Sequence, residues 1–371
     1  MLHPSRRRNV RRILRACEPI PADVITDPDP GGIPSPLRTA RVAWAAVRDD
    51  ATHHLVLQDD VILTTAFAQH LQDVVARWPD HAITLYVNWN SPYNSYRVRC
   101  AALAGHPWAA MAPWEWVPTL GLVLPSRHAR GLAAYLGTLP GTCTEDDDEV
   151  ARFCAATGIP VLATVPNLLE HDEGPSLAGS QGIRHATVTA GLPPPGTGYW
   201  RGAHVTHEPV PWRYGAVSLF RSACYVRHWA LDGQRSLGQL PYPWTRWSQR
   251  CQLLGVPRDR IVSAFVRRTP SGRDHNPAIA LEFWAAGFMI GAEAGRTAGT
   301  RSPDSEAISM RDDALGTWVR SGLDEDDARS LGPAGRRLLG ELCAEAVEQG
   351  WSFGESAGSR AGGLAGSATA W

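Results

Sequence analysis

The sequence predicts an α/β protein, with a mixed sheet flanked by helices in its first half and a mixed, later mostly helical region after it. Up to about residue 198, short apolar runs of strand length alternate with longer segments of helical period. The length of 371 residues corresponds to two or three domains of ordinary size. Hydrophobic residues make up 44% and charged residues 20%, which is typical of a globular protein and excludes a disordered or coiled-coil chain.

Three segments are expected along the chain. Residues 1–198 form the α/β domain, and residues 199–352 form a C-terminal region of unknown role that is helical from about residue 306. Residues 353–371 are rich in Gly, Ser and Ala. We expect this tail to be disordered, because it buries too little apolar surface to offset the entropy of ordering it.

The elements of the α/β domain follow from local patterns. A helix is predicted from Ser5, a favourable N-cap residue, to about Cys17, and a strand at Ala22–Thr26. Residues 89–116, rich in Pro and Trp, are expected to form a long loop. The other predicted helices cover 37–47, a segment capped by Thr64 or Thr65, a segment from Ser126 to about Leu136 and one headed by Thr144, and the other strands cover 53–58, 82–88, 119–125 and 159–166.

Charge and residue usage exclude several classes of function. Lys+Arg 36 against Asp+Glu 37 gives a net charge of -1, so a basic nucleic-acid surface is not expected. All 36 basic residues are Arg, which excludes Schiff-base, P-loop and other lysine-dependent chemistry. The seven Cys are scattered and contain no CxxC pair, so a reducing cytoplasm is expected. Neither a signal peptide nor a membrane span is predicted.

The most informative string is HHLVLQDDVILTTAF, in which Asp59 and Asp60 follow an apolar strand directly. In an open α/β sheet, ligands bind beyond the carboxyl ends of the strands. Mg²⁺-like ions take carboxylate oxygens together with substrate phosphates, so this turn is a candidate site for a metal diphosphate. The alternative is a solvated turn that caps the following helix.

These residues resemble a known family. THHLVLQDDVILTTAFAQHL, TLGLVLPSRHARGLAAYL and TEDDDEVARFCAATGIPVLATVPNLLEH look like the donor-site strand, the acceptor-side unit and the closing segment of GT-A glycosyltransferases. The nearest resemblance is to the lipopolysaccharide-type galactosyltransferases of glycosyltransferase family 25, over roughly residues 1–182. Gln58 stands where that family usually has a carboxylate, and the first strand is nearly absent before His3.

The resemblance implies roles for particular residues. Asp60 and Asp59 would bind Mn²⁺ or Mg²⁺, with Asp59 alternatively on the sugar, and His171 would supply a third ligand; the alternative for His171 is a surface histidine. The opening HPSR resembles a turn at which a basic residue approaches the nucleotide, so Arg6 is a candidate to contact a phosphate, with Arg7 and Arg8 as alternatives. Asp27 is placed to meet the ribose or base, or else to initiate an Asp-Pro turn.

An inverting transferase also needs a carboxylate base, and Asp146, Asp147 and Asp148 are the candidates. At a helix N-terminus the macrodipole favours ionised carboxylates, so we expect all three to be charged. Asp147 lies three residues after Thr144, the reciprocal capping position, which favours a structural role for it. The alternative is an ordinary acidic first turn.

The sequence therefore leads us to expect a metal-dependent glycosyltransferase that moves a sugar from a nucleotide-sugar donor, a UDP-hexose, to a hydroxyl of a glycan, peptide or natural product. Inversion follows from the resemblance alone. One alternative is a catalytically inactive GT-A-like binding module, suggested by Gln58. The other is a nucleotidyl- or phosphoryl-transfer enzyme, which the lack of Lys and of a Gly-rich phosphate loop disfavours.

Overall fold

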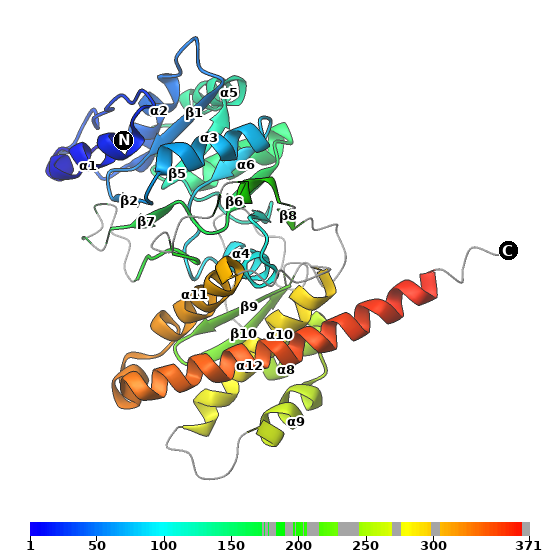
Figure 1. Ribbon diagram of the computed structural model, residues 1–371. Coiled ribbons are helices and arrows are strands. Elements are labelled where there is room, and N and C mark those ends of the chain that lie inside the picture. Colours follow the sequence, from blue (N-terminus) through cyan, green and yellow to red (C-terminus); the bar gives the residue numbers. More distant parts are fainter. Residues whose placement is uncertain are drawn as a thin grey trace. The chain divides into compact units, whose positions relative to one another are not determined.

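The computed structural model describes residues 1–172, 174, 177, 183–189, 196, 198–202, 204–205, 215–228, 245–268, 276–297 and 305–365. They fall into two compact units (Figure 1). The first contains Met1–Trp89 and the described part of Pro107–Ala203. The second contains Asn90–His106 and the described residues from His204 onward. Residues 190–195 and 197, next to the boundary predicted at residue 198, lie outside the described residues.

A mixed sheet forms the centre of the first unit. Its strands lie in the order β1-β5-β3-β6-β4 through this unit. Only β3 and β6 run parallel, and the other pairs are antiparallel. The predicted mixed α/β class is thereby confirmed. The bounds are β1 His53–Leu57, β3 Ala82–Thr84, β4 Trp108–Ala110, β5 Gly121–Pro125 and β6 Val161–Thr164.

Helices cover both faces of this sheet, as the alternation along β5 shows. Leu122 and Leu124 pack in one apolar cluster with Trp44 and Leu132, whereas Val123 packs in a second cluster with Phe67. Successive side chains of a strand point to opposite faces, so the two clusters lie on either side of the sheet. The helices are α1 Arg7–Cys17 after the short helix η1 Pro4–Arg6, α2 Pro36–Ala45, α3 Phe67–Arg77, α5 Ser126–Thr138 and α6 Asp147–Thr157.

Several predicted strands are shorter than expected or absent. Residues 22–25 join no strand, and Thr26 makes only an isolated bridge with Leu2. The strand predicted at 82–88 ends at Thr84. An unpredicted antiparallel pair forms between β2, Val61–Leu63, and β7, Leu169–His171. These differences share a cause: apolar runs favour extended backbone, but a strand also needs a partner, which the run does not specify.

The loop predicted at 89–116 is wrong. It contains α4, Asn94–Ala104, in which every residue is buried, as well as β4. A helix buried on all sides shows no amphipathic period, so its pattern does not stand out in the sequence. This helix belongs to the second unit.

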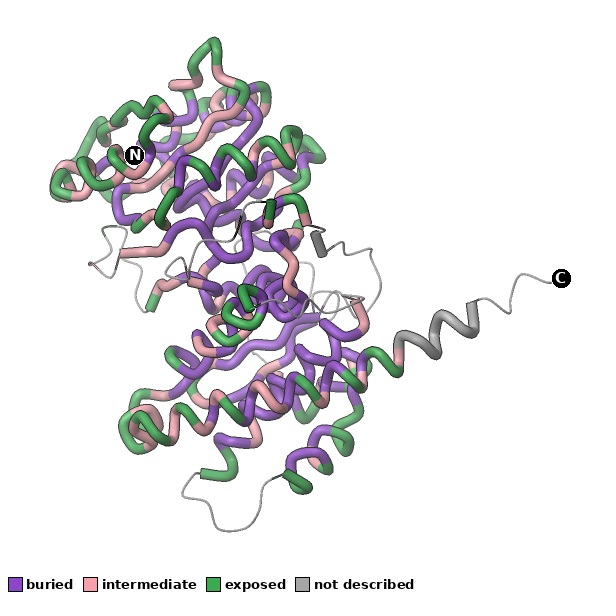
Figure 2. Tube along the Cα trace, viewed as in Figure 1, coloured by how far each residue is buried: buried purple, intermediate pink, exposed green. Residues whose placement is uncertain are grey.

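The second unit combines a small antiparallel sheet with long helices. The sheet order is β11-β10-β9, and α10 packs along α12 at glycines: a Cβ on Gly291 would lie 2.3 Å from the carbonyl oxygen of Val347. Along α10, every residue from Phe283 to Gly295 is buried, and buried residues are purple in Figure 2. The bounds are η2 Tyr199–Arg201 in the first unit, β8 His204–Val205, β9 Gly215–Phe220, β10 Ala223–His228, β11 Thr245–Arg246, α8 Trp247–Arg250, η4 Cys251–Leu254, α9 Arg258–Arg268, α10 Pro277–Thr297, α11 Ser305–Ser321 and α12 Glu325–Ala365.

Two features of these helices bear on the sequence expectations. The disordered tail predicted at 353–371 is wrong for its first part, since α12 continues to Ala365 and Gly354 lies against the backbone of Ala292; residues 366–371 lie outside the described part.

Helix α10 has the length and hydropathy to cross a membrane, but 83% of that window is buried within the protein, and such a helix does not establish a span.

Candidate functional site

The acid pair lies at the end of β1 and is buried. Asp59 and Asp60 are 8% and 6% exposed, so the alternative of a solvated turn is wrong. One nitrogen of the Arg6 guanidinium, Nη1, donates to Asp59 Oδ1 at 2.9 Å and to Asp60 Oδ2 at 2.6 Å. Arg6, predicted to contact a phosphate, thus bridges the two carboxylates predicted to hold a metal.

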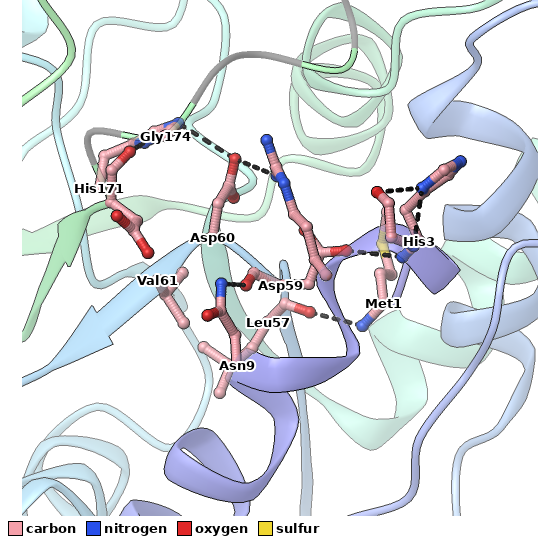
Figure 3. A network of polar contacts seen from close by, with 12 residues as sticks. Met1, His3, Asn9, Leu57, Asp59, Asp60, Val61, His171 and Gly174 are labelled. Atoms are coloured by element: carbon pink, nitrogen blue, oxygen red, sulfur yellow. Dashed lines mark hydrogen bonds and ion pairs between the residues drawn. The ribbon is translucent and has the colours of Figure 1, made fainter.

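The start of the chain fixes Asp59 in place. The backbone N–H of His3 donates to Asp59 Oδ2 at 2.6 Å, and the Asn9 side-chain amide donates to the Asp59 carbonyl at 2.9 Å. Figure 3 shows Met1, His3 and Asn9 around Asp59, with Asp60 directed toward His171. The short helix η1 begins directly after His3. The turn that places the His3 N–H on Asp59 therefore also positions Arg6 next to both acids.

The β2–β7 pair brings His171 to Asp60. Val61 is in register with His171, and His171 Nε2 lies 3.4 Å from Asp60 Oδ2. His171 Nδ1 donates to the Asp172 carbonyl at 2.7 Å, and burial lowers the pKa of the imidazole, so the ring is neutral with its proton on Nδ1. Nε2 then accepts from Arg184 Nη1 at 3.0 Å.

A cavity of about 420 Å³ joins these groups. Seven of the eight residues singled out in the sequence line it, and Asp148 is the one that does not. Arg38, Arg184 and Thr119 also line it; no local motif marks these three. The seven predicted residues are Arg6, Asp27, Asp59, Asp60, Asp146, Asp147 and His171.

Asp27 has a structural role in this wall. Arg38 binds it in bidentate fashion, with Nε 2.8 Å from Oδ1 and Nη2 2.9 Å from Oδ2. The backbone N–H of Asp29 also donates to Asp27 Oδ1, which forms the predicted turn. The hydrogen bonds from Arg38 lower the pKa of Asp27. The carboxylate is therefore ionised, and its oxygens are already engaged by Arg38.

The acidic tract differs from expectation in both capping and charge. Helix α6 begins at Asp147, with Asp146 rather than Thr144 at the N-cap position. Asp147 Oδ1 accepts the backbone N–H of Asp148, so the predicted pairing of Asp147 with Thr144 is wrong.

Burial decides the charge of these acids. It raises the pKa of Asp146 to about 6 and, with repulsion from Asp146 and Asp148, the pKa of Asp147 to about 7. The pKa of Asp148 is raised too, mainly by burial. The expectation that all three are fully charged is wrong, because desolvation of a buried carboxylate outweighs the dipole of one helix.

The donor atoms around Asp60 fit a hard divalent cation. Asp60 Oδ1 is buried and has no hydrogen-bond partner in the described part of the chain. Asp60 Oδ2 and His171 Nε2 face each other as two acceptors. The described residues contain no cluster of three or more His, Cys, Asp or Glu side chains arranged for a metal, but Mg²⁺ commonly binds through one or two carboxylates plus substrate phosphates.

No family model, curated protein or solved structure matches this chain. The chemistry of the cavity is therefore assigned from its own residues.

Proposed function

We propose that this cavity binds a nucleotide sugar, a UDP-hexose, with a divalent cation, and transfers the sugar to a hydroxyl acceptor. The observation that carries the proposal is that one cavity holds a buried acid pair at a strand end together with the buried Asp146 and the half-buried Asp147, whose pKa values lie near neutrality. The GT-A topology is part of the same proposal.

The wall of the cavity carries both arginines and carboxylates, which suits a nucleotide-sugar donor bound together with a cation. Arg6 and Arg184 line the cavity and would bind the diphosphate oxygens, since guanidinium groups match phosphate geometry. Asp60 and His171 would hold the cation, with Asp59 beside them. When bound, Mn²⁺ or Mg²⁺ supplies stabilisation of negative charge on the departing diphosphate. As donor and cation enter together, Arg6 would exchange its carboxylate partners for phosphate. Arg184 would likewise exchange its bond to His171 Nε2 for phosphate, which frees that nitrogen for the cation.

The proton of the acceptor needs a base on the cavity wall. Asp147, with a pKa of about 7, suits this role best, because a base is most effective when its pKa lies near the working pH. Its Oδ1 is occupied by the Asp148 N–H, which leaves Oδ2 to accept the proton. As the acceptor oxygen bonds to the anomeric carbon, the C–O bond to phosphate breaks and its electron pair leaves with the diphosphate. Displacement from the opposite side inverts the configuration.

The test is release of UDP from a panel of UDP-sugars with Mn²⁺. We expect Asp60→Asn to reduce release at least 100-fold, because the amide cannot supply the anionic oxygen that has no partner. Asp80→Asn is the matched control, since Asp80 is exposed and forms a surface ion pair with Arg127. Release that survives both Asp60→Asn and EDTA would contradict the metal role.

A second function is favoured by the Arg6 contacts. The Arg6 guanidinium already contacts both acids and offsets one of their two negative charges, which suits a module that binds a nucleotide sugar without a metal and without turnover. Thermal stabilisation by UDP-sugars that is unchanged by EDTA, with no UDP release over a broad acceptor panel, would identify this module.

A further inference from the structure

Helix α1 of the first unit has one strongly basic face. The helix has 11 residues, of which only Cys17 is buried (Figure 2). At 3.6 residues per turn, five exposed arginines fall within an arc of about 140° around the helix, and its apolar side chains lie on the other side. These arginines, which form the basic face, are Arg7, Arg8, Arg11, Arg12 and Arg15.

The described residues supply little negative charge to the basic face. Arg12 lies 3.8 Å from Asp172, with both side chains partly exposed, and it also donates to the Val61 carbonyl at 2.9 Å. The other four arginines form no ion pair with any described residue. The whole chain, by contrast, is balanced, with Lys+Arg 36 against Asp+Glu 37. The positive charge is therefore gathered on this helix and left for an external anion.

This arrangement is unfavourable for the helix itself. Like charges three or four residues apart repel each other, and such pairs recur along the face, as with Arg7 and Arg11 or Arg11 and Arg15. The first turn contains no acidic residue, although the helix dipole favours negative charge there. Departures from local rules without an internal gain are expected at functional surfaces, so the basic face is suited to binding.

We propose that the basic face binds an anionic lipid bilayer, with α1 lying along the plane of the lipid phosphates. Guanidinium groups match phosphate geometry, and each basic residue next to an anionic leaflet adds to the affinity. The apolar side of α1 is already used within the protein, because Ile13 and Cys17 pack in the cluster that contains Phe67. The helix therefore binds by charge at the membrane surface and does not insert.

Two features favour a bilayer over a nucleic acid. Ile62 is 42% exposed and follows Val61, to which Arg12 is bonded, and an aliphatic side chain beside basic ones suits the boundary between headgroups and acyl chains. Residues 7–15 contain no aromatic side chain, whereas proteins that bind single-stranded nucleic acids stack the bases on aromatic rings.

The test is sedimentation of the protein with vesicles of phosphatidylcholine, with or without phosphatidylglycerol. We expect binding only to the vesicles that contain phosphatidylglycerol, and binding that weakens as salt screens the charges. Arg8→Gln/Arg11→Gln/Arg15→Gln should weaken it roughly 100-fold, because each arginine near an anionic surface contributes about fivefold. The charge-conserving Arg8→Lys/Arg11→Lys/Arg15→Lys should keep most of the affinity.

The control variant removes the same charge from another helix. Arg258, Arg260 and Arg267 are exposed arginines on opposite sides of α9, so they do not form one face. Arg258→Gln/Arg260→Gln/Arg267→Gln should therefore bind the anionic vesicles as the unaltered protein does.

Stability separates binding from a structural role of the arginines. The α1 glutamine variant relieves repulsion between like charges, so without vesicles we expect it to melt at or above the temperature of the unaltered protein. If the arginines only supported the fold, this variant would melt lower, and the lysine variant would bind as poorly as the glutamine variant.

Three results would overturn the proposal. The first is equal binding of anionic vesicles by the unaltered protein and the α1 glutamine variant, and the second is an equal loss in the α1 and α9 variants. The third is binding to DNA or RNA that the α1 variant loses, without binding to anionic vesicles, which would assign the basic face to a nucleic acid. None of these measurements involves sugar transfer, so the bilayer proposal and the proposed function are tested separately.

Discussion

At the scale of single residues, the site is governed by how buried charges are balanced. Arg6 places one cation between two carboxylates that are each less than a tenth exposed. Removal of one member of a buried charge set leaves the others unpaired, which is more destabilising than the set is stabilising. Arg6 is therefore structural when the cavity holds no cation, and a bound metal would replace its charge.

Arg6→Gln tests this exchange of cations. We expect the variant to lose about 2–4 kcal/mol of unfolding free energy, and Mn²⁺ to restore more stability to it than it adds to the unaltered protein. Chemical denaturation with and without Mn²⁺ measures both effects. Arg127→Gln, at an exposed ion pair, is the control and should change stability little. An Arg6→Gln variant as stable as the unaltered protein would contradict the role of Arg6.

The acidic tract predicts a dependence of stability on pH. The folded-state pKa values of Asp146 and Asp147 are raised from 3.8 to about 6 and about 7. The folded state therefore binds more protons than the unfolded state, so this contribution is fully present below about pH 4 and is lost as the pH rises to about 7.

Asp147→Asn removes the titration of one group. We expect the variant to match the unaltered protein near pH 4 and to exceed its unfolding free energy at pH 8 by roughly 1–3 kcal/mol, since one pKa unit corresponds to about 1.4 kcal/mol. Urea denaturation at the two pH values measures the difference. A constant difference between them would show that burial does not perturb Asp147.

At the scale of elements, close backbone approach decides which helices can pack. α10 lies against α12 at glycines whose Cβ would collide with backbone atoms. Gly316 in α11 makes no such close approach, because a Cβ at this position would meet nothing within 4 Å.

Gly291 in α10 and Gly316 in α11 form a matched pair for substitution by alanine. Gly291→Ala would place a Cβ 2.3 Å from the Val347 carbonyl oxygen, and we expect it to lower the unfolding free energy by about 2 kcal/mol or more. Gly316→Ala should raise it by about 0.5–1 kcal/mol, because alanine is the better helix former. Thermal and urea unfolding of both variants provide the comparison. Equal changes in unfolding free energy for the two variants would show that the backbones of α10 and α12 are not in close contact at Gly291.

At the scale of the whole molecule, the chain order and the spatial units differ. Helix α4 interrupts the first unit in sequence but belongs to the second. Its Arg99 donates to the Ala314 carbonyl and the Thr317 hydroxyl of α11, more than 200 residues away. A division of the sequence at one position cannot describe such an arrangement.

The sequence by itself determined the mixed α/β class, most helices of the first half and the position of Asp59 and Asp60 at a strand end, because apolar spacing records which faces are buried. Only the tertiary structure decided that Arg6 lies between those acids, that Arg184 binds His171 and that Asp147 is neutralised in part. These depend on contacts between groups apart in the sequence, 53 residues for Arg6 and Asp59 and 13 residues for Arg184 and His171, or on local desolvation. Spacing along a chain encodes periodicity, but it does not encode which distant side chains share a buried space.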